Sequence, residues 1–445
     1  MAIIDSTIIV ADDLTGANDT ALQFFKSGCK AKIIIDCEQD FSNSQDIDVW
    51  AISTESRNVD KKEAVDRVFS ACEKLKNSLN PQNFYKKIDS TLRGNTGLEI
   101  LAMLEAVGAD ACVVAPAYIE EKRTTVGGYQ LLNGTPIERT QCALDPKAPI
   151  LDSYIPNIIK KDFNPQLFDL IDVVGFSVVS KGAGPITLKI NELIQKGKKI
   201  IIVDAASNVD LEQINLAIHK SSYKILPTGS AGLAQAMNKE ILQDEKETKT
   251  NVQKIKHLPD LATLVVSGSA TQLCAKQIQR LKEEKTNSYF VDLTVKDILN
   301  GVDEAMVEDI VSKLNSKINV IIHGSYLKQE LMEEQAQNLL INSGIAKSEF
   351  PNKITDYLAE LLAKINETSH FILVTIGGET SYKCAKKINS KYLELMDAIM
   401  PAIPLCKDAQ GQIIVTKSGN FGTIETLLNI SNYFKKLKAN DVEEI

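Results

Sequence analysis

The sequence lacks the features that mark zinc-binding, disulfide-rich, membrane and secreted proteins. Its eight cysteines include no C-x-x-C pair and its four histidines lie far apart, which argues against a zinc site or a disulfide framework. No apolar run approaches the ~20 residues of a membrane span. The N-terminus has neither the basic start nor the long apolar core of a signal peptide. We therefore expect a cytoplasmic protein whose cysteines are mostly buried, reduced thiols.

Two further absences narrow the class of ligand. The formal net charge is −8 and no basic run stands out, which argues against nucleic acid or a membrane surface as a partner. The sequence also has no G-x-x-x-x-G-K-[ST] and no G-x-G-x-x-G motif, so neither a Walker-type loop nor a standard dinucleotide fingerprint is present. We expect a small-molecule ligand.

The hydrophobic pattern predicts two α/β domains with mainly parallel sheets. A chain of 445 residues, 44% of them hydrophobic, is too long for one ordinary core. Strand-like runs alternate with helical stretches such as Lys61 to Leu79 and Gly97 to Val107, the pattern of a parallel sheet covered by helices. The polar stretch from Lys239 to Asp260 separates the two halves, so we expect domains over residues 1–240 and 260–445 with a linker over 241–259. The strand-like runs are TIIVA, AKIIID, DVWAIS, NFYKKID, ACVVAPA, VVGFSVVS, KKIIIVDA and YKILPT, then TLVVSGSAT, VIIHGS, FILVTIGGET, AIMPAIPLC and IIVTKSGNFG.

Polar and charged residues follow several strands of the first half, where open α/β sheets bind ligands. The residues are Asp12, Asp13, Arg57, Lys87, Asp89, Ser90 and Arg93. Carboxylates accept hydrogen bonds from hydroxyl groups, and arginine matches a planar carboxylate, so the mixture suits a polyhydroxy acid. We expect the two adjacent aspartates to face the hydroxyl groups, and Arg57, Arg93 and Lys87 to hold the acid group. A plainer interpretation is that Asp13 or Thr15 caps a helix and that Lys87 pairs with Asp89.

The segment from Ala115 to Pro156 is long and contains several glycines and prolines. It is either a surface loop or an arm, and loops of this length often form lids or interface arms. We favour an arm that shapes the first-domain site or makes a homodimer contact.

Three strands of the second half end in small polar residues before a helix. The turns lie at residues 267–271 (SGSAT), 377–380 (GGET) and 417–422 (KSGNFG). Glycines let the backbone approach a ligand closely, and a helix N-terminus supplies N–H donors for phosphate. One such turn is usually only tight-turn geometry. Three in one domain, with Lys417 beside the last, predict a nucleotide site.

These motifs together resemble the four-carbon acid sugar kinase family over nearly the whole chain. The stretches that carry the resemblance are ADDLTGAND, KIDSTLRGN, RTTVGGY with NGTPIERT, GSAGLA, VVSGSAT, GGET and KSGNFG. The resemblance implies a sugar-acid-binding N-terminal domain, an ATP-binding C-terminal domain, and a ligand cleft between them. It assigns Asp12, Asp13, Arg57, Lys87, Asp89, Ser90 and Arg93 to the sugar acid, and Ser267, Gly377, Gly378, Glu379, Thr380, Gly419 and Gly422 to ATP. One departure is Lys122, where similar sequences tend to have glycine, which puts the shape of that loop in question.

The family's substrates include D-threonate, D-erythronate and 3-oxo-tetronates, which implies ATP-dependent phosphorylation of a terminal C4 hydroxyl. Mg²⁺ is expected as a second cofactor, and the sequence assigns it no ligand. Asp12 or Asp89 is the expected general base. We favour Asp12 because its motif has no nearby cation, whereas Asp89 lies close to Lys87 and Arg93.

Two other functions remain open at this point. A nicotinamide-dependent sugar-acid dehydrogenase also needs an acid-binding and a glycine-rich domain, although the dinucleotide fingerprint is missing. A non-catalytic sugar-acid sensor would leave the second domain without an evident role.

Overall fold

A computed structural model describes residues 6–39, 41, 46–145, 148–244, 255, 257–284 and 286–439. The chain divides into two compact units, Met1–Val252 and Gln253–Ile445. Helix α8 (Ala231–Asp244) continues into the start of the predicted linker, and residues 245–254 and 256 of that linker lie outside the described residues. Within the described ranges, no helix is long and apolar enough to cross a membrane.

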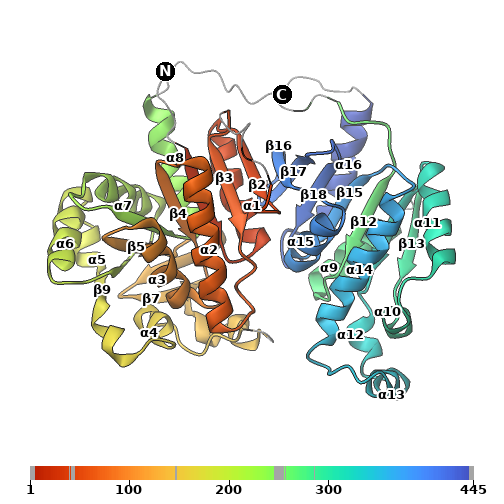
Figure 1. Cartoon of the computed structure of the whole chain (residues 1–445), viewed down its shortest axis with the longest axis horizontal. Helices are drawn as coiled ribbons and strands as arrows, with labels where there is room; N and C mark the ends of the chain where they lie inside the picture. The colour runs from red at the N-terminus through yellow and green to blue at the C-terminus, as the bar shows by residue number, and fades with distance from the viewer. Residues whose placement is uncertain are drawn as a thin grey trace. The chain divides into compact units, whose positions relative to one another are not determined.

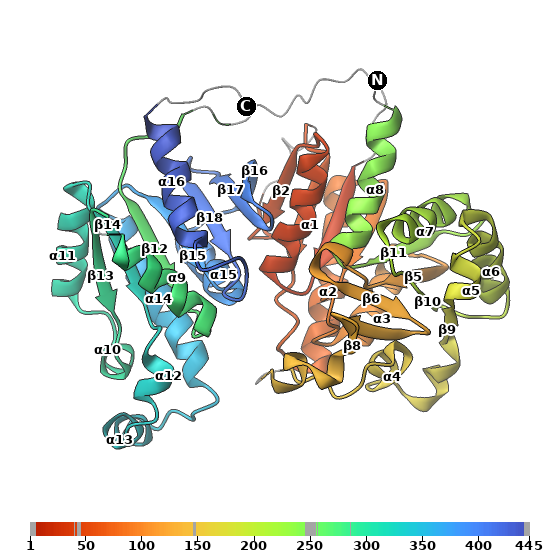
Figure 2. The same cartoon turned by 180° about the vertical axis from the view of Figure 1, so that it is seen from behind.

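Unit 1 is a parallel sheet covered by helices on both faces (Figures 1 and 2). Most of its central strands are apolar and buried because both faces are covered. Helices α1 (Leu14–Lys26), α7 (Asn208–Lys220) and α8 pack side by side on one face, and α2 (Lys61–Leu79) and α3 (Thr96–Val107) on the other. Helix α6 (Ala183–Gln195) packs beside α7, and the short helices α4 (Ile155–Lys160) and α5 (Phe176–Val179) complete the unit. The strand order is β2 (Ala31–Ile34), β3 (Val49–Ser53), β1 (Thr7–Ala11), β4 (Asn83–Lys87), β11 (Ile225–Gly229), β5 (Ala111–Ala115), β10 (Ile200–Val203) and β9 (Ile171–Val174).

One strand prediction in this unit is wrong in its second half. The run VVGFSVVS is not one strand, because β9 ends at Val174 and helix α5 begins at Phe176. Gly175 lies at the N-cap position, and the Phe176 N–H donates to the Asp204 carboxylate (2.9 Å). This side-chain acceptor replaces a backbone partner at the first turn, so an apolar sequence with strand propensity forms a helical turn.

The predicted arm contains a small antiparallel sheet of its own. Strands β6 (Arg123–Val126), β7 (Tyr129–Leu132) and β8 (Thr135–Pro136) pair in that order. Asp204, just after β10, accepts the backbone N–H groups of Gly127 (2.7 Å) and Gly128 (2.8 Å) at the β6–β7 turn. The arm is thereby fixed at the carboxyl end of the unit 1 sheet.

Unit 2 has the same three-layer plan, with a parallel sheet extended by a hairpin. Helices α9 (Gln272–Glu283) and α16 (Thr426–Lys438) cover one face, and α11 (Glu304–Asn315), α14 (Phe350–Asn366) and α15 (Gly378–Lys387) cover the other. Helices α10 (Val295–Asn300), α12 (Leu327–Glu330) and α13 (Glu334–Asn342) complete the unit. The strand order is β13 (Ser288–Asp292), β14 (Asn319–His323), β12 (Thr263–Ser267), β15 (Ile372–Ile376), β18 (Ile413–Lys417), β17 (Ile403–Asp408) and β16 (Tyr392–Met400).

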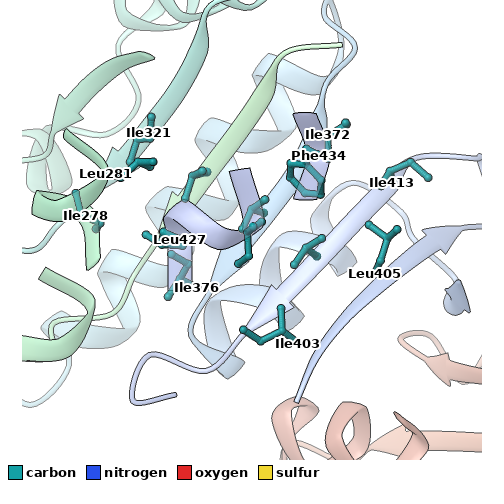
Figure 3. Close-up of a cluster of buried hydrophobic side chains, with 14 of the residues drawn as sticks. Ile278, Leu281, Ile321, Ile372, Ile376, Ile403, Leu405, Ile413, Leu427 and Phe434 are labelled. Atoms are coloured by element: carbon teal, nitrogen blue, oxygen red, sulfur yellow. The ribbon is translucent and has the colours of Figure 1, made fainter. Parts of the chain in front are cut away.

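A hydrophobic core joins the sheet of unit 2 to helices α9 and α16 (Figure 3). Ile278 and Leu281 of α9 and Phe434 of α16 are buried in the same cluster as Ile321 and Ile372 of the sheet. Burial of each such side chain contributes about 1.5–3 kcal/mol relative to exposure. This packing holds the ends of the strands, and the loops that follow them, in fixed positions.

One strand prediction in unit 2 is wrong, and one strand of this unit was not predicted. AIMPAIPLC is not one strand but the end of β16, a turn and the start of β17, which pair antiparallel. The run SYFVD of β13 was not predicted, because this strand lies at the edge of the sheet and its residues are only partly buried. An edge strand lacks the continuous apolar run of a central one.

Both units place their first four parallel strands in the same spatial order. In unit 1 the order is β2-β3-β1-β4, and in unit 2 it is β13-β14-β12-β15. In each case the first strand lies between the third and the fourth. The connection from the first strand therefore runs toward one edge of the sheet, and the connection from the third runs past it in the opposite direction. Open α/β sheets bind ligands at the carboxyl end of such a switch point. We therefore look for a site at the ends of β1 and β12.

Candidate functional site

A single arginine joins two carboxylates at the switch point of unit 1. Arg57 Nε and Nη2 donate to the two oxygens of Asp12 (2.7 and 2.9 Å), and Nη1 and Nη2 donate to those of Asp13 (2.7 and 2.9 Å). Burial opposes the ionisation of Asp12, but the positive charges of Arg57, Lys86 and Lys87 together outweigh it and lower the pKa of this carboxyl. Asp12 is therefore present as a carboxylate, and it shares the guanidinium group with Asp13.

This arrangement corrects one expectation and confirms another. The expectation that Asp12 has no nearby cation is wrong, because β1 and β3 pair in register from Thr7 and Val49 and so bring Arg57 to the end of β1. The capping role of Asp13 is confirmed, since its side chain accepts the Gly16 N–H (2.8 Å) at the start of α1.

A second ion-pair cluster follows β4. Arg93 Nε donates to Asp89 Oδ2 (2.7 Å), and Arg93 Nη1 donates to Asp145 of the arm (3.1 Å). Burial raises the pKa of Asp89, but Arg93 and Arg57 together hold it well below its usual range. The plainer interpretation that Lys87 pairs with Asp89 is wrong in the described structure, because Lys87 Nζ donates to the Ile88 carbonyl instead (3.0 Å).

The arm contributes directly to this region. Gln130 of β7 donates its side-chain N–H to the Ser90 carbonyl (2.7 Å), beside the Asp89 cluster. Lys122, which precedes β6, has a φ of +56°, so the residue that replaces glycine in this loop keeps the left-handed backbone that glycine favours. These contacts support the expectation that the arm shapes the first-domain site.

Sequence reasoning missed three charged residues in this region. Glu55 accepts from the Ser53 hydroxyl (2.6 Å) and the Leu14 N–H (3.1 Å), and burial raises its pKa to about 7. Lys86 and Glu99 form a fully buried salt bridge (2.8 Å) beneath the loops. Lys86 was detectable in principle, because a lysine that alternates with apolar residues in a central strand must find a buried partner.

The three glycine-containing turns of unit 2 follow adjacent strands β12, β15 and β18 and contact one another. Thr271 Oγ1 donates to the Gly419 carbonyl (2.9 Å). A Cβ atom added to Gly419 would lie 2.0 Å from Ser269 Oγ, and one added to Gly268 would lie 2.3 Å from Thr380 Oγ1. The close backbone approach therefore requires glycine at both positions.

Two helices begin at these turns and offer N–H donors to an anion. Thr271 is the N-cap of α9, and Gly377, with a φ of +111°, is the N-cap of α15 and makes no side-chain capping bond. Gly378 begins α15. Lys417 is buried beside them, donates to the Ser418 carbonyl (2.8 Å), and has its pKa lowered by burial to about 8. N–H groups and an ammonium group at one place suit phosphate.

The other residues expected at ATP are placed differently. The Ser267 hydroxyl is buried and lies 3.3 Å from Cys274 Sγ, and the Glu379 side chain pairs with Lys383 and accepts from Thr355. Thr380 is buried against Gly268. Gly422 has a φ of +87° and packs against Thr426. These four residues make contacts that build the turns.

Comparison with known proteins agrees with this division between the units. A sugar-binding N-terminal domain model matches residues 7–237, and a nucleotide-binding C-terminal domain model matches residues 264–427. D-erythronate kinase of Heliobacterium modesticaldum is 27% identical, over 98% of each chain. The chain belongs to the four-carbon acid sugar kinase family. This chain is also 27% identical to D-threonate kinase of Salmonella typhimurium, over 98% of this chain and 99% of the relative. It is 25% identical to 3-oxo-tetronate kinase of Haemophilus influenzae, over 93% of this chain and 96% of the relative.

Two crystal structures share the fold of this family member. A Salmonella typhimurium protein described as a tRNA synthase superposes with a TM-score of 0.78 at 21% identity, covering 96% of this chain and 99% of its own. A Haemophilus influenzae protein superposes with a TM-score of 0.72 at 23% identity, covering 96% and 100%. At this identity the likeness concerns the fold alone.

Proposed function

We propose that this protein transfers the γ-phosphoryl group of ATP to the terminal C4 hydroxyl of a four-carbon sugar acid such as D-threonate, D-erythronate or a 3-oxo-tetronate. The observation that carries the proposal is the cluster of Asp12, Asp13 and Arg57 at the switch point of the sugar-binding unit. The kinase names of the full-length relatives favour this reaction over a dehydrogenase or a sensor.

The carboxylates and cations of unit 1 have separate tasks in this proposal. Asp12 and Asp13 keep further lone pairs for sugar hydroxyl groups after binding Arg57, because each ionised carboxylate offers about four acceptor sites. Arg57 already uses four N–H groups on them. We therefore assign it chiefly to positioning the carboxylates, and assign the acid group of the substrate to Lys87 and Arg93, with Ser90 beside them.

Asp12 remains the proposed general base, for a new reason. Both Asp12 and Asp89 are paired with arginine, but Asp89 also accepts from the Thr91 hydroxyl (2.5 Å), so fewer of its lone pairs are free. The carboxylate with more free lone pairs is better placed to accept a proton from the substrate. It would take the proton of the C4 hydroxyl as that oxygen attacks.

The turns of unit 2 fit the phosphates of ATP. Gly377, Gly378 and Gly419 would let the backbone approach them, and the ammonium group of Lys417 would offset their charge. When bound, ATP supplies the phosphoryl group, and Mg²⁺ neutralises charge on the phosphates. Mg²⁺ commonly keeps several waters and is held partly by the substrate phosphates, and we assign it no residue of this chain.

A substrate screen tests the proposal. Purified protein with ATP and Mg²⁺ is mixed with each tetronate isomer and each 3-oxo-tetronate, and ADP release is measured. We expect ADP release with at least one acid and little without acid. NADH absorbance with the same acids provides the parallel test for a dehydrogenase. Absence of ADP release with every acid would overturn the proposal.

A further inference from the structure

Strand β14 ends in a buried histidine with one unused nitrogen. His323 is 2% exposed, and its Nε2 lies 2.8 Å from Asp292 Oδ1 at the end of β13. Burial lowers the pKa of His323 despite the nearby Asp292, so the ring is neutral, donates from Nε2 and has an acceptor at Nδ1. Within the described residues, Nδ1 is buried and has no hydrogen-bond partner.

The loop that follows this histidine holds a second buried polar atom of this kind. Ser325 Oγ is also buried without a hydrogen-bond partner in the described part of the chain. Buried polar side-chain atoms are nearly always paired, because an unpaired one costs about 1–3 kcal/mol. Two such atoms two residues apart therefore indicate a polar partner that binds at this loop.

The loop adjoins the proposed phosphate-binding turns. The Gly324 N–H lies 3.4 Å from the Ser267 carbonyl at the end of β12, and the Gly268 N–H donates to the Ile376 carbonyl (3.2 Å) at the end of β15. Helix α10 lies beyond the end of β13 in Figure 2, and α12 begins at Leu327, shortly after β14 ends at His323. The loops after β14, β12 and β15 thus form one row along the edge of the sheet.

The shared strand order gives a second reason to place this loop in the site. In unit 1 the corresponding loop follows β3, and its Ser56 and Arg57 N–H groups donate to the Asp12 carbonyl (3.0 and 3.3 Å). That loop contributes Arg57 to the cluster with Asp12 and Asp13. The loop after β14 occupies the equivalent place in unit 2.

The chemistry of the loop suits a nucleoside better than a phosphate group. Asp292 is 46% exposed and would repel phosphate, whereas a carboxylate, a neutral imidazole acceptor and a hydroxyl group all bond well to sugar hydroxyls. Tyr326 is 52% exposed, and its ring centroid lies 6.1 Å from that of His323. An exposed aromatic face beside these groups can stack on a base.

We propose that the loop after β14 binds the nucleoside end of ATP, with His323 Nδ1 and Ser325 Oγ on the ribose hydroxyl groups. The purine base then lies against Tyr326, and the phosphates extend toward the turns after β12, β15 and β18. This inference rests on the proposed function and assigns the ribose end of its nucleotide site.

Calorimetric titration with two probes separates the nucleoside end from the phosphates. ATP and inorganic tripolyphosphate, each with Mg²⁺, are titrated into the full-length wild type and into Ser325→Ala, His323→Phe and Ser316→Ala. Ser316 is an exposed serine at the end of α11 and serves as the matched control. We expect Ser325→Ala and His323→Phe to weaken ATP binding by about tenfold, the effect of one lost hydrogen bond, and to leave tripolyphosphate binding unchanged.

A sugar-modified nucleotide provides the second readout. The wild type should bind ATP about a hundredfold more tightly than 2′,3′-dideoxy-ATP, which lacks the hydroxyl partners of both groups, and Ser325→Ala should reduce this preference to about tenfold. If ATP and tripolyphosphate weaken in parallel in Ser325→Ala, or if the wild type does not distinguish the two nucleotides, the assignment of the ribose is overturned while the proposed function stands. If the wild type binds neither ATP nor tripolyphosphate, the proposed function is overturned with it.

Discussion

Arg57 shows how the chemistry of one residue depends on its partners. Its guanidinium is 13% exposed and bridges Asp12 and Asp13, so its removal leaves two carboxylates without their main counter-charge. Breaking one side of a buried ion pair costs about 3–5 kcal/mol. We expect Arg57→Ala to lower the free energy of unfolding by an amount near the lower end of that range, measured by urea denaturation.

Arg139→Ala is the control for this experiment. Arg139 also pairs with a carboxylate, Glu138, but its side chain is 75% exposed, so the loss should stay below about 1 kcal/mol. A different outcome is also informative. If Arg57→Ala kept the wild-type stability and had a hundredfold higher KM for the acid, we would infer that Arg57 contacts the substrate directly.

The choice of general base is also decided at the residue scale. We expect Asp12→Asn to lower kcat by roughly 10²- to 10⁴-fold, because the amide keeps the size of the side chain but cannot accept a proton. Asp89→Asn should raise the KM for the acid more than it lowers kcat, since Asp89 positions Arg93. Pre-steady-state transfer rates at saturating ATP and acid measure the difference. If Asp12→Asn transferred the phosphoryl group at a near wild-type rate and Asp89→Asn did so slowly, Asp89 would be the general base and Asp12 the positioning residue.

At the scale of elements, three turns act together because they follow adjacent strands. The hydrogen bond from Thr271 to the Gly419 carbonyl joins the turn after β12 to the turn after β18, and Lys417 lies at the end of β18. Lys417 has a pKa of about 8, below the ordinary value for lysine, because burial disfavours its charged form. It is therefore charged below about pH 8 and becomes neutral as the pH rises further.

This titration predicts a pH dependence of nucleotide binding. If Lys417 attracts the phosphates, ATP affinity should be constant between about pH 7 and 8 and should fall above pH 8, by up to about tenfold per pH unit. Lys417→Met should bind ATP more weakly and show no such fall. Cys274 is the neighbour that raises the pKa of Lys417, so Cys274→Ala should keep the fall in affinity but move it to lower pH. If the fall in ATP affinity above pH 8 persisted in Lys417→Met, a group other than Lys417 would be responsible for it.

At the scale of the whole molecule, the chain consists of two units that match two different domain models. A ligand stabilises the part that binds it by RT ln(1 + [L]/Kd), about 2.7 kcal/mol at a hundred times Kd. In a unit of this size that corresponds to a rise in Tm of about 5–10 °C. We expect a nucleotide and a sugar acid, added separately, to raise the Tm of different unfolding transitions in scanning calorimetry.

Two variants assign the transitions. Gly419→Val, in unit 2, should abolish the shift caused by ATP and keep the shift caused by the acid, because a branched side chain at this position meets Ser269. Arg93→Ala, in unit 1, should have the opposite effect. A single transition raised equally by either ligand would show that the two units unfold as one.

The sequence by itself determined the α/β class, most strands, the bounds of α2, and the family. These features depend on local patterns, namely apolar runs, helical spacing and motifs that read continuously along the chain. The edge strand β13 and the helical turn α5 were not predictable in this way, because burial at a sheet edge and a side-chain acceptor from Asp204 depend on distant residues.

Only the tertiary structure decided which charges meet. Arg57 is 45 positions from Asp12, and the parallel pairing of β1 and β3 brings them into contact, which reverses the expectation that Asp12 has no nearby cation. The same holds for Lys86 with Glu99 and for His323 with Asp292, each pair joined across separate elements. The sequence specifies the side chains, but strand register and burial determine which of them are partners. The pKa values and roles of these side chains depend on those partners.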